Sequence, residues 1–185
     1  MNIKSKYCLL PIVFLVSGCT GVPDGVTPVR NLDLERYLGK WYEIARLDHR
    51  FERGLSHVTA TYSKRNDGGI RVVNRGYDSR KKEWKEAEGK AYSVAESTIG
   101  RLKVSFFGPF YGGYNILALD TENYRYSLVS GPNRSYLWIL SRTPVMEPGV
   151  LERLVQLAQK LGFDTSQLIY VDHTGEVALN SRTGE

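Results

Sequence analysis

Hydrophobic and polar residues alternate with a period of two along most of the chain between residues 39 and 140. In 57–65, Val58, Ala60 and Tyr62 share one face, and hydroxyl side chains occupy the other. The pattern recurs, with short turns between, at 70–75, 86–91, 101–106, 114–118, 127–129 and 136–140, and a further strand is expected at 39–46. Eight such segments joined by short turns predict an all-β domain, an antiparallel up-and-down meander.

Closing such a meander into a barrel removes its exposed edges, and an eight-stranded barrel can hold one small ligand. The alternation then predicts an inward wall that is mostly apolar, with tyrosine hydroxyls and one amide, and that is suited to an acyl chain. Its residues are Val58, Ala60, Tyr62, Val72, Asn74, Val104, Phe106, Tyr114, Ile116, Val129, Tyr136 and Trp138. A barrel filled by its own side chains is the alternative. The small residues Ala60, Ala87, Gly89 and Ala91 favour an open interior.

The period changes at 147–161, where Pro148 is placed to begin a helix and Gly162 to end it. One stripe of this helix is apolar: Val150, Leu151, Leu154, Val155, Ala158 and Leu161. We expect the helix to pack outside the barrel. The barrel domain is predicted to span 31–175, followed by a polar tail at 176–185.

The first 18 residues predict a signal peptide. Lys4 and Lys6 precede an apolar run at 8–16, which is too short to span a bilayer. The next residues, Val16-Ser17-Gly18-Cys19, resemble the bacterial lipobox, in which cysteine is lipidated and becomes the mature N-terminus. An ordinary secretory signal with an incidental cysteine is the alternative.

The chain has two cysteines, and cleavage before Cys19 removes Cys8, which leaves no possible intrachain disulfide. By its resemblance to lipoproteins, Cys19 is expected to carry N-palmitoyl and S-diacylglycerol groups, which anchor the protein in a membrane. Thr20 follows it, and lipoproteins without Asp at that position are sorted to the outer membrane. Residues 19–30 are predicted to form a lipidated tether, about 35 Å long if extended.

Composition and charge exclude other classes. The 185 residues are 42% hydrophobic and 24% charged, which excludes a wholly disordered chain. The net charge of +5 is too small and too scattered to indicate nucleic-acid binding.

Catalytic and metal-binding motifs are absent from the sequence. His49 is expected in a loop, His57 at a strand start and His173 in the tail, so none is expected inside the barrel. The inward positions then offer only Tyr, Asn and Ser as reactive groups. We therefore expect no metal site, no cofactor and no enzymatic activity.

Three segments resemble the signatures of the lipocalin family. Residues 31–42, from Asn31-Leu32-Asp33 through Gly39-Lys40-Trp41-Tyr42, resemble the first, 120–124 the second and 140–142 the third. The segments 49–54 and 106–114 resemble the bacterial outer-membrane lipocalins, which are lipoproteins.

The resemblance implies that Trp41 closes the narrow end of the barrel, with Arg142 across its ring and Gly39 beside it. The alternative is a Trp41 that is plain core and an Arg142 that is solvated. It also implies an outer-membrane protein that binds fatty acids or lysophospholipids, for membrane maintenance under stress. A lipid-modifying enzyme on this fold and a structural surface lipoprotein remain alternatives, and a homodimer is possible.

The anchor prediction can be tested by the substitution Cys19→Ser. Without the thiol the precursor cannot be acylated, so the protein should become soluble or stay uncleaved. It should no longer fractionate with outer membranes. Unchanged fractionation would show that another part of the protein attaches it.

Overall fold

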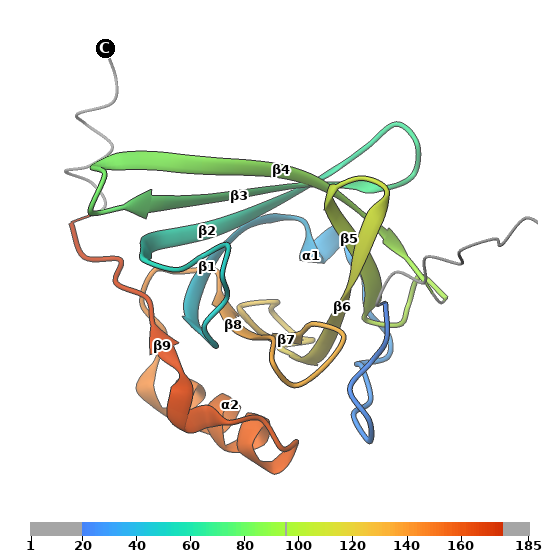
Figure 1. Ribbon diagram of the computed structural model, residues 1–185. Helices are drawn as coiled ribbons and strands as arrows, with labels where there is room; N and C mark the ends of the chain where they lie inside the picture. The colour runs from blue at the N-terminus through green and yellow to red at the C-terminus, as the bar shows by residue number, and fades with distance from the viewer. Residues whose placement is uncertain (1–19, 95, 176–185) are drawn as a thin grey trace, which may run out of the picture.

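The computed structural model describes residues 20–94 and 96–175 of the chain, which form a β-barrel with one long helix outside it (Figure 1). The predicted signal peptide, Cys19 and the tail 176–185 lie outside the described residues. The barrel strands are β1 Gly39–Arg46, β2 Leu55–Lys64, β3 Ile70–Asp78, β4 Glu83–Ser93, β5 Arg101–Phe107, β6 Phe110–Leu119, β7 Tyr126–Ser130 and β8 Leu137–Ser141. This arrangement confirms the predicted all-β fold.

Strand β1 closes the barrel because it pairs antiparallel with both β8 and β2. Its first half pairs with β2, from Gly39 opposite Tyr62 to Tyr42 opposite Thr59. Farther along, a two-residue strand, β9 (Ile169–Tyr170), takes the place of β2 beside β1. A register shift between Glu43 and Ala45 changes which β1 side chains point inward.

Helix α2 (Pro148–Lys160) packs on the outer face of the barrel, as predicted. Its buried residues Val150, Leu154 and Ala158 join an outer core. That core also contains Ile44, Ala45, Leu117, Leu128, Leu137 and Ile139, from β1, β6, β7 and β8. The helix therefore covers the outward apolar side chains of four strands, and a short 3₁₀ turn, η1 (Thr165–Gln167), leads from it to β9.

The segment 20–30 differs from the free tether expected from the sequence, because it packs along the barrel. Val26 is buried in the outer core, and the Val29 N–H donates to the Ile116 carbonyl at 2.8 Å. The Asn115 amide donates to the Gly21 carbonyl at 3.0 Å. Apolar side chains and unpaired backbone groups on β6 hold the segment, so it does not extend away from the domain.

One end of the barrel is closed by Trp41, which is fully buried. The Arg142 guanidinium carbon lies 3.9 Å from the centre of its ring, a cation–π contact. The indole Nε1 donates to the Tyr37 carbonyl at 2.8 Å. Gly39 has φ of +95°, and a Cβ there would lie 3.3 Å from Arg142 Nη1. These contacts place the three predicted base residues together.

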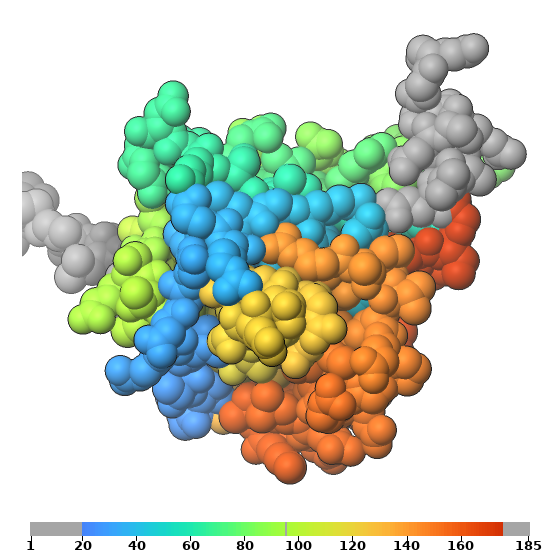
Figure 2. Space-filling view, turned by 180° about the vertical axis from the view of Figure 1, so that it is seen from behind, coloured from blue at the N-terminus to red at the C-terminus, as the bar shows by residue number. Residues whose placement is uncertain are grey.

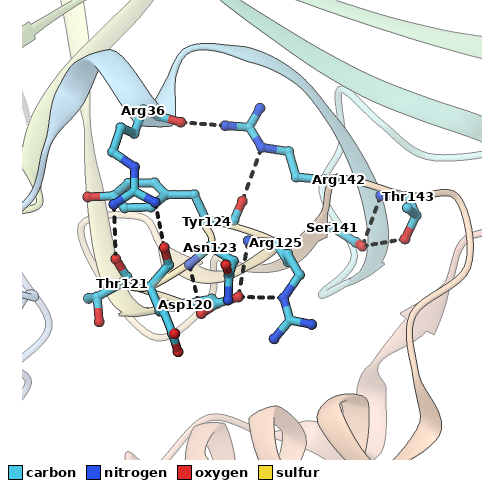
Figure 3. Close-up of polar contacts among 10 residues, drawn as sticks. Arg36, Asp120, Thr121, Asn123, Tyr124, Arg125, Ser141, Arg142 and Thr143 are labelled. Atoms are coloured by element: carbon cyan, nitrogen blue, oxygen red, sulfur yellow. Dashed lines mark hydrogen bonds and ion pairs between the residues drawn. The ribbon is translucent and has the colours of Figure 1, made fainter.

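The Arg142 guanidinium also donates to four backbone carbonyls, of which those of Arg36 and Tyr124 are drawn in Figure 3. Its Nη2 reaches the carbonyls of Arg36 at 2.7 Å and Tyr37 at 3.2 Å, in helix α1 (Leu34–Tyr37). Its Nη1 reaches Lys40 at 3.0 Å, and its Nε reaches Tyr124 at 3.1 Å. One side chain therefore joins α1, β1, β8 and the β6–β7 connection.

Arg36 completes the closed end from the other side. Its guanidinium lies 4.3 Å from the centre of the Tyr124 ring and donates to the carbonyls of Thr121 and Glu122 (Figure 3). Tyr124 in turn accepts, at its hydroxyl, the backbone N–H of Asp33 at 2.9 Å. The space-filling view from behind shows this end covered by the N-terminal segment and the β6–β7 connection (Figure 2).

Removal of either partner at the closed end should destabilise the fold. We expect Arg142→Ala and Trp41→Ala each to lower the free energy of unfolding by about 1–5 kcal/mol, Trp41→Ala more because it leaves a cavity. The double variant should lose less than the sum, since the two side chains touch. Arg142→Lys is the matched control that keeps the charge. It should recover little of the lost stability, because a lysine ammonium cannot donate to four carbonyls at once. Strictly additive losses in denaturant unfolding would contradict the contact.

Candidate functional site

The pairing register identifies the side chains that point into the barrel. Trp41 faces inward, and it lies opposite Ala60 on β2. Ala60 lies opposite Asn74 on β3, and Asn74 opposite Ala87 on β4. Because directly paired residues share a face of the sheet, all four point into the interior.

Most of the predicted wall lies in one interior cluster around Trp41. Its members from that wall are Ala60, Tyr62, Val72, Val104, Phe106, Tyr114, Ile116, Val129 and Trp138. Val58 is buried and lies beside Gly76. Gly76 is two residues beyond the inward-facing Asn74 on β3, so Val58 lies on the inward side as well. Tyr136 lies just before β8, and its ring stacks on Trp138 with centres 6.2 Å apart.

Solvent reaches several of these inward positions. Ala60, Asn74, Val104 and Trp138 are half-buried, and Ala87 is exposed, although the register points all of them inward. The exposure favours an accessible interior over a barrel filled by its own side chains. Because the Trp41 end is covered, access is from the other end, here called the mouth and formed by the connections 47–54, 79–82, 108–109 and 131–136.

Three tyrosine hydroxyls form a polar group above Trp41. The Tyr114 hydroxyl lies 2.8 Å from that of Tyr37 and 2.9 Å from that of Tyr62. Burial raises the pKa of Tyr37 to about 12 and also raises the pKa values of Tyr62 and Tyr114. These phenols therefore stay neutral at physiological pH and bond mainly to each other.

A buried charged group, which the sequence pattern did not predict, lies nearer the mouth. Arg46 Nη1 lies 2.7 Å from the Glu43 carboxylate, and its Nη2 donates to the Glu52 carbonyl at 2.9 Å. The Trp138 indole N–H donates to the Glu52 carboxylate at 3.0 Å. Burial raises the pKa values of the Glu43 and Glu52 carboxyls above their ordinary value.

His49 lies among these groups, so the expectation that no histidine points inward is wrong. Its exposed fraction is 2%, and its ring stacks on Tyr136 at 5.0 Å between centres and contacts Trp138 at 4.6 Å. The loop 47–54 thus carries His49 against two residues of the predicted wall. Glu43, Arg46, His49 and Glu52 add acid–base groups to an interior for which only Tyr, Asn and Ser were expected. Burial and the nearby Arg46 charge lower the pKa of His49 to about 4.

Within residues 20–94 and 96–175, no group of three or more His, Cys, Asp or Glu side chains is arranged to hold a metal ion. In the same part of the chain, no helix is long and apolar enough to cross a bilayer. The interior is thus lined by an apolar wall, with neutral tyrosine hydroxyls toward the Trp41 end. Toward the mouth lies the charged group, in which Arg46 pairs with Glu43.

The low pKa of His49 makes a testable contribution to stability. The folded protein holds His49 neutral down to about pH 4, while in the unfolded chain it takes up a proton near pH 6.5. Lowering the pH from 7 to 5 therefore favours unfolding, by about 2 kcal/mol for this group. His49→Phe, which keeps the stacked ring, should lose correspondingly less stability over that range. Denaturant unfolding at both pH values gives the difference, and identical pH dependence in the two proteins would contradict the burial of a neutral imidazole.

Comparison with known proteins agrees with this architecture. Residues 32–173 match the family model described as a lipocalin-like domain. The chain is 63% identical over 157 residues to outer membrane lipoprotein Blc of Vibrio cholerae, covering 85% of this chain and 92% of that protein. It is 55% identical over 175 residues to outer membrane lipoprotein Blc of Escherichia coli K12, covering 90% and 98%.

Among solved structures, insecticyanin from the tobacco hornworm Manduca sexta superposes with a TM-score of 0.67 at 24% identity, over 84% of this chain and 88% of that one. This likeness concerns the fold alone. The bacterial relatives agree with the predicted outer-membrane location. The chain therefore belongs to the lipocalin family, among its bacterial outer-membrane lipoproteins.

Proposed function

We propose that this protein binds single-chain lipids, fatty acids or lysophospholipids, inside its barrel and stores or carries them for membrane maintenance under stress. The observation that carries the proposal is the inward wall, which is apolar, reached by solvent and closed at one end by Trp41. The outer-membrane location supplies a source of such lipids.

An acyl chain suits this wall for an energetic reason. Each CH₂ group removed from water contributes about 0.8 kcal/mol before the cost of ordering the chain. The wall offers aromatic and branched apolar surface on several strands, from Val104 and Phe106 to Val129 and Trp138. Affinity should therefore depend mainly on chain length.

The polar head group belongs at the mouth. Moving a charged head group to the Trp41 end would bury it without a free partner, because the tyrosine hydroxyls there already bond to each other. At the mouth the head group keeps its water. The lipid would thus enter tail first.

A second function, lipid modification, is favoured by one observation. Glu43, Glu52 and His49 bring acid–base groups into the interior, and enzymes use such buried carboxyls and imidazoles. The two carboxyls are engaged, however, Glu43 with Arg46 and Glu52 with Trp138, and the buried His49 nitrogens have no side-chain partner to orient the ring as a base. We therefore propose binding without chemistry.

Native mass spectrometry after incubation with a lysophospholipid separates the carrier from the enzyme and from the structural lipoprotein. A carrier returns the lipid intact, and a structural lipoprotein with a filled barrel retains none.

The binding proposal is tested by a chain-length series. Trp138 fluorescence should change on titration with fatty acids, and affinity should rise with each pair of methylenes added. Val104→Trp places a large side chain inside the barrel and should weaken binding at least tenfold. Val73→Trp is the matched control, because Val73 lies opposite Thr61 and Glu88 on the outer face.

Affinity that is independent of chain length would overturn the interior site. Equal loss of binding in the two tryptophan variants would do the same. Circular dichroism of both variants shows whether the fold is kept.

A further inference from the structure

We infer that the mouth of the barrel faces and docks onto the surface of the bilayer that holds the protein's lipid anchor, with an aromatic and basic rim entering the lipid head groups. The inference goes beyond lipid binding. It rests on the outer-membrane location and on acylation of Cys19.

The first observation is three exposed phenylalanines at the mouth. Phe51 lies in the β1–β2 loop, and Phe107 and Phe110 flank the β5–β6 turn. Their exposed fractions are 63%, 81% and 62%, although a large aromatic side chain ordinarily loses most of its surface on folding. Antiparallel order places both connections at the same end of the barrel, opposite Trp41. Exposed aromatic rings gathered around an opening mark an interaction surface.

The second observation is the charge beside these rings. The β3–β4 turn at the mouth, residues 79–82, reads Ser-Arg-Lys-Lys, and all four residues are exposed. Arg50, next to Phe51, is also exposed. The acidic side chains near these cations are paired: Glu83 lies 4.0 Å from Lys81, Asp78 pairs with Lys85, and Asp48 pairs with Arg53. Aromatic rings bordered by cations complement a bilayer containing anionic lipids, where rings enter the interface and cations meet phosphates.

The third observation is the course of the N-terminal segment, which fixes the side of the molecule that the anchor leaves from. Thr20 and Gly21 lie against Gly113, whose missing side chain permits the approach: a Cβ there would be 2.6 Å from the Gly21 carbonyl oxygen. Gly113 is three residues from Phe110, about 10 Å along the strand. The packed segment therefore brings the chain to within a short distance of the rim.

Further contacts tie the same segment to the β7–β8 connection, which forms part of the mouth. An added Cβ on Gly21 would lie 3.7 Å from the Pro132 carbonyl oxygen. Arg134 Nη2 donates to the Asp24 carbonyl at 2.6 Å. The described chain thus begins, at Thr20, in the mouth half of the barrel, and Cys19 directly precedes it in the sequence. A bilayer that holds acyl chains on Cys19 would therefore lie near Phe51, Phe107 and Phe110.

The docking proposal can be tested with the full-length, acylated protein in phospholipid vesicles, held by its own anchor. Phe107→Cys supplies a thiol for an environment-sensitive fluorophore at the mouth, and the Cys19 thiol is blocked by acylation. Val145→Cys is the matched control, because Val145 is 78% exposed and follows Arg142 at the closed end. Quenching by spin-labelled phospholipid reports which label enters the membrane.

The expected result is strong quenching at position 107 and little at 145. Adding phosphatidylglycerol to phosphatidylethanolamine vesicles should increase the quenching at 107, and Lys81→Glu with Lys82→Glu should abolish that increase. Equal quenching at both positions, or more at 145, would overturn the proposal. Self-quenching at 107 that rises with protein density and ignores the lipid quencher would also overturn it, and would assign the rim to a second copy of the chain.

Two further measurements keep the outcome clear. If Phe107→Cys loses the near-ultraviolet circular dichroism of the folded protein, Phe110→Cys replaces it at the same turn. Fatty-acid titration in solution is scored separately. Binding without quenching at the mouth contradicts only the docking, whereas quenching without binding contradicts only the carrier function.

Discussion

The Arg142 guanidinium is the group on which the closed end depends. Its planar fork of donors serves carbonyls from α1, β1 and the β6–β7 connection, while its face covers Trp41. A guanidinium keeps its charge under these conditions, so its partial burial must be offset by these acceptors and by the ring. Residues 36–40, Tyr124 and Arg142 itself, which are far apart in the sequence, therefore meet at one cation. Side chains in a strand alternate between its two faces. Because Arg142 points inward, Leu140 and Trp138, two and four residues before it in β8, also face the interior.

Because the barrel is closed at the Trp41 end, its two ends differ and the interior is reached from one side. With the Trp41 end covered, solvent reaches the interior from the mouth, where His49 of the loop 47–54 stacks on Tyr136. Arg46 holds that loop from inside by donating to the carbonyls of Glu52 and Leu55. The segment 20–30 runs toward the same end of the barrel, where Gly21 lies against Gly113 and Asp24 accepts from Arg134. The described N-terminal residues and the open end of the interior therefore lie on the same side of the molecule.

The sequence predicted the strands, the outer helix and most of the inward wall, because side chains in a strand alternate strictly and a closed barrel has only two faces. It missed the Glu43–Arg46 pair because the register shift near Ala45 breaks the alternation and turns both ends of the sequence Glu-Ile-Ala-Arg inward. It missed His49 because burial of a loop residue follows from tertiary packing and leaves no periodic pattern. The segment 20–30 read as a tether for a similar reason: Val26 and Val29 are isolated apolar residues between Gly and Pro, and only the barrel surface shows what they pack against.

The charged group inside an otherwise apolar wall has a structural explanation that also bears on ligand choice. A buried ion pair contributes little net stability, since desolvation offsets most of the attraction. Here the pair positions the loop 47–54, and through the Glu52 carboxylate it fixes the indole of Trp138. The Glu43 carboxylate and the two terminal nitrogens of Arg46 are occupied by each other and by backbone carbonyls, so the pair offers few hydrogen bonds to an entering lipid. In the proposed carrier, an acyl chain would pass this level to reach the wall beyond it, and the head group would remain among the exposed residues of the mouth. The proposed site would then select the length of the chain more than the identity of the head group.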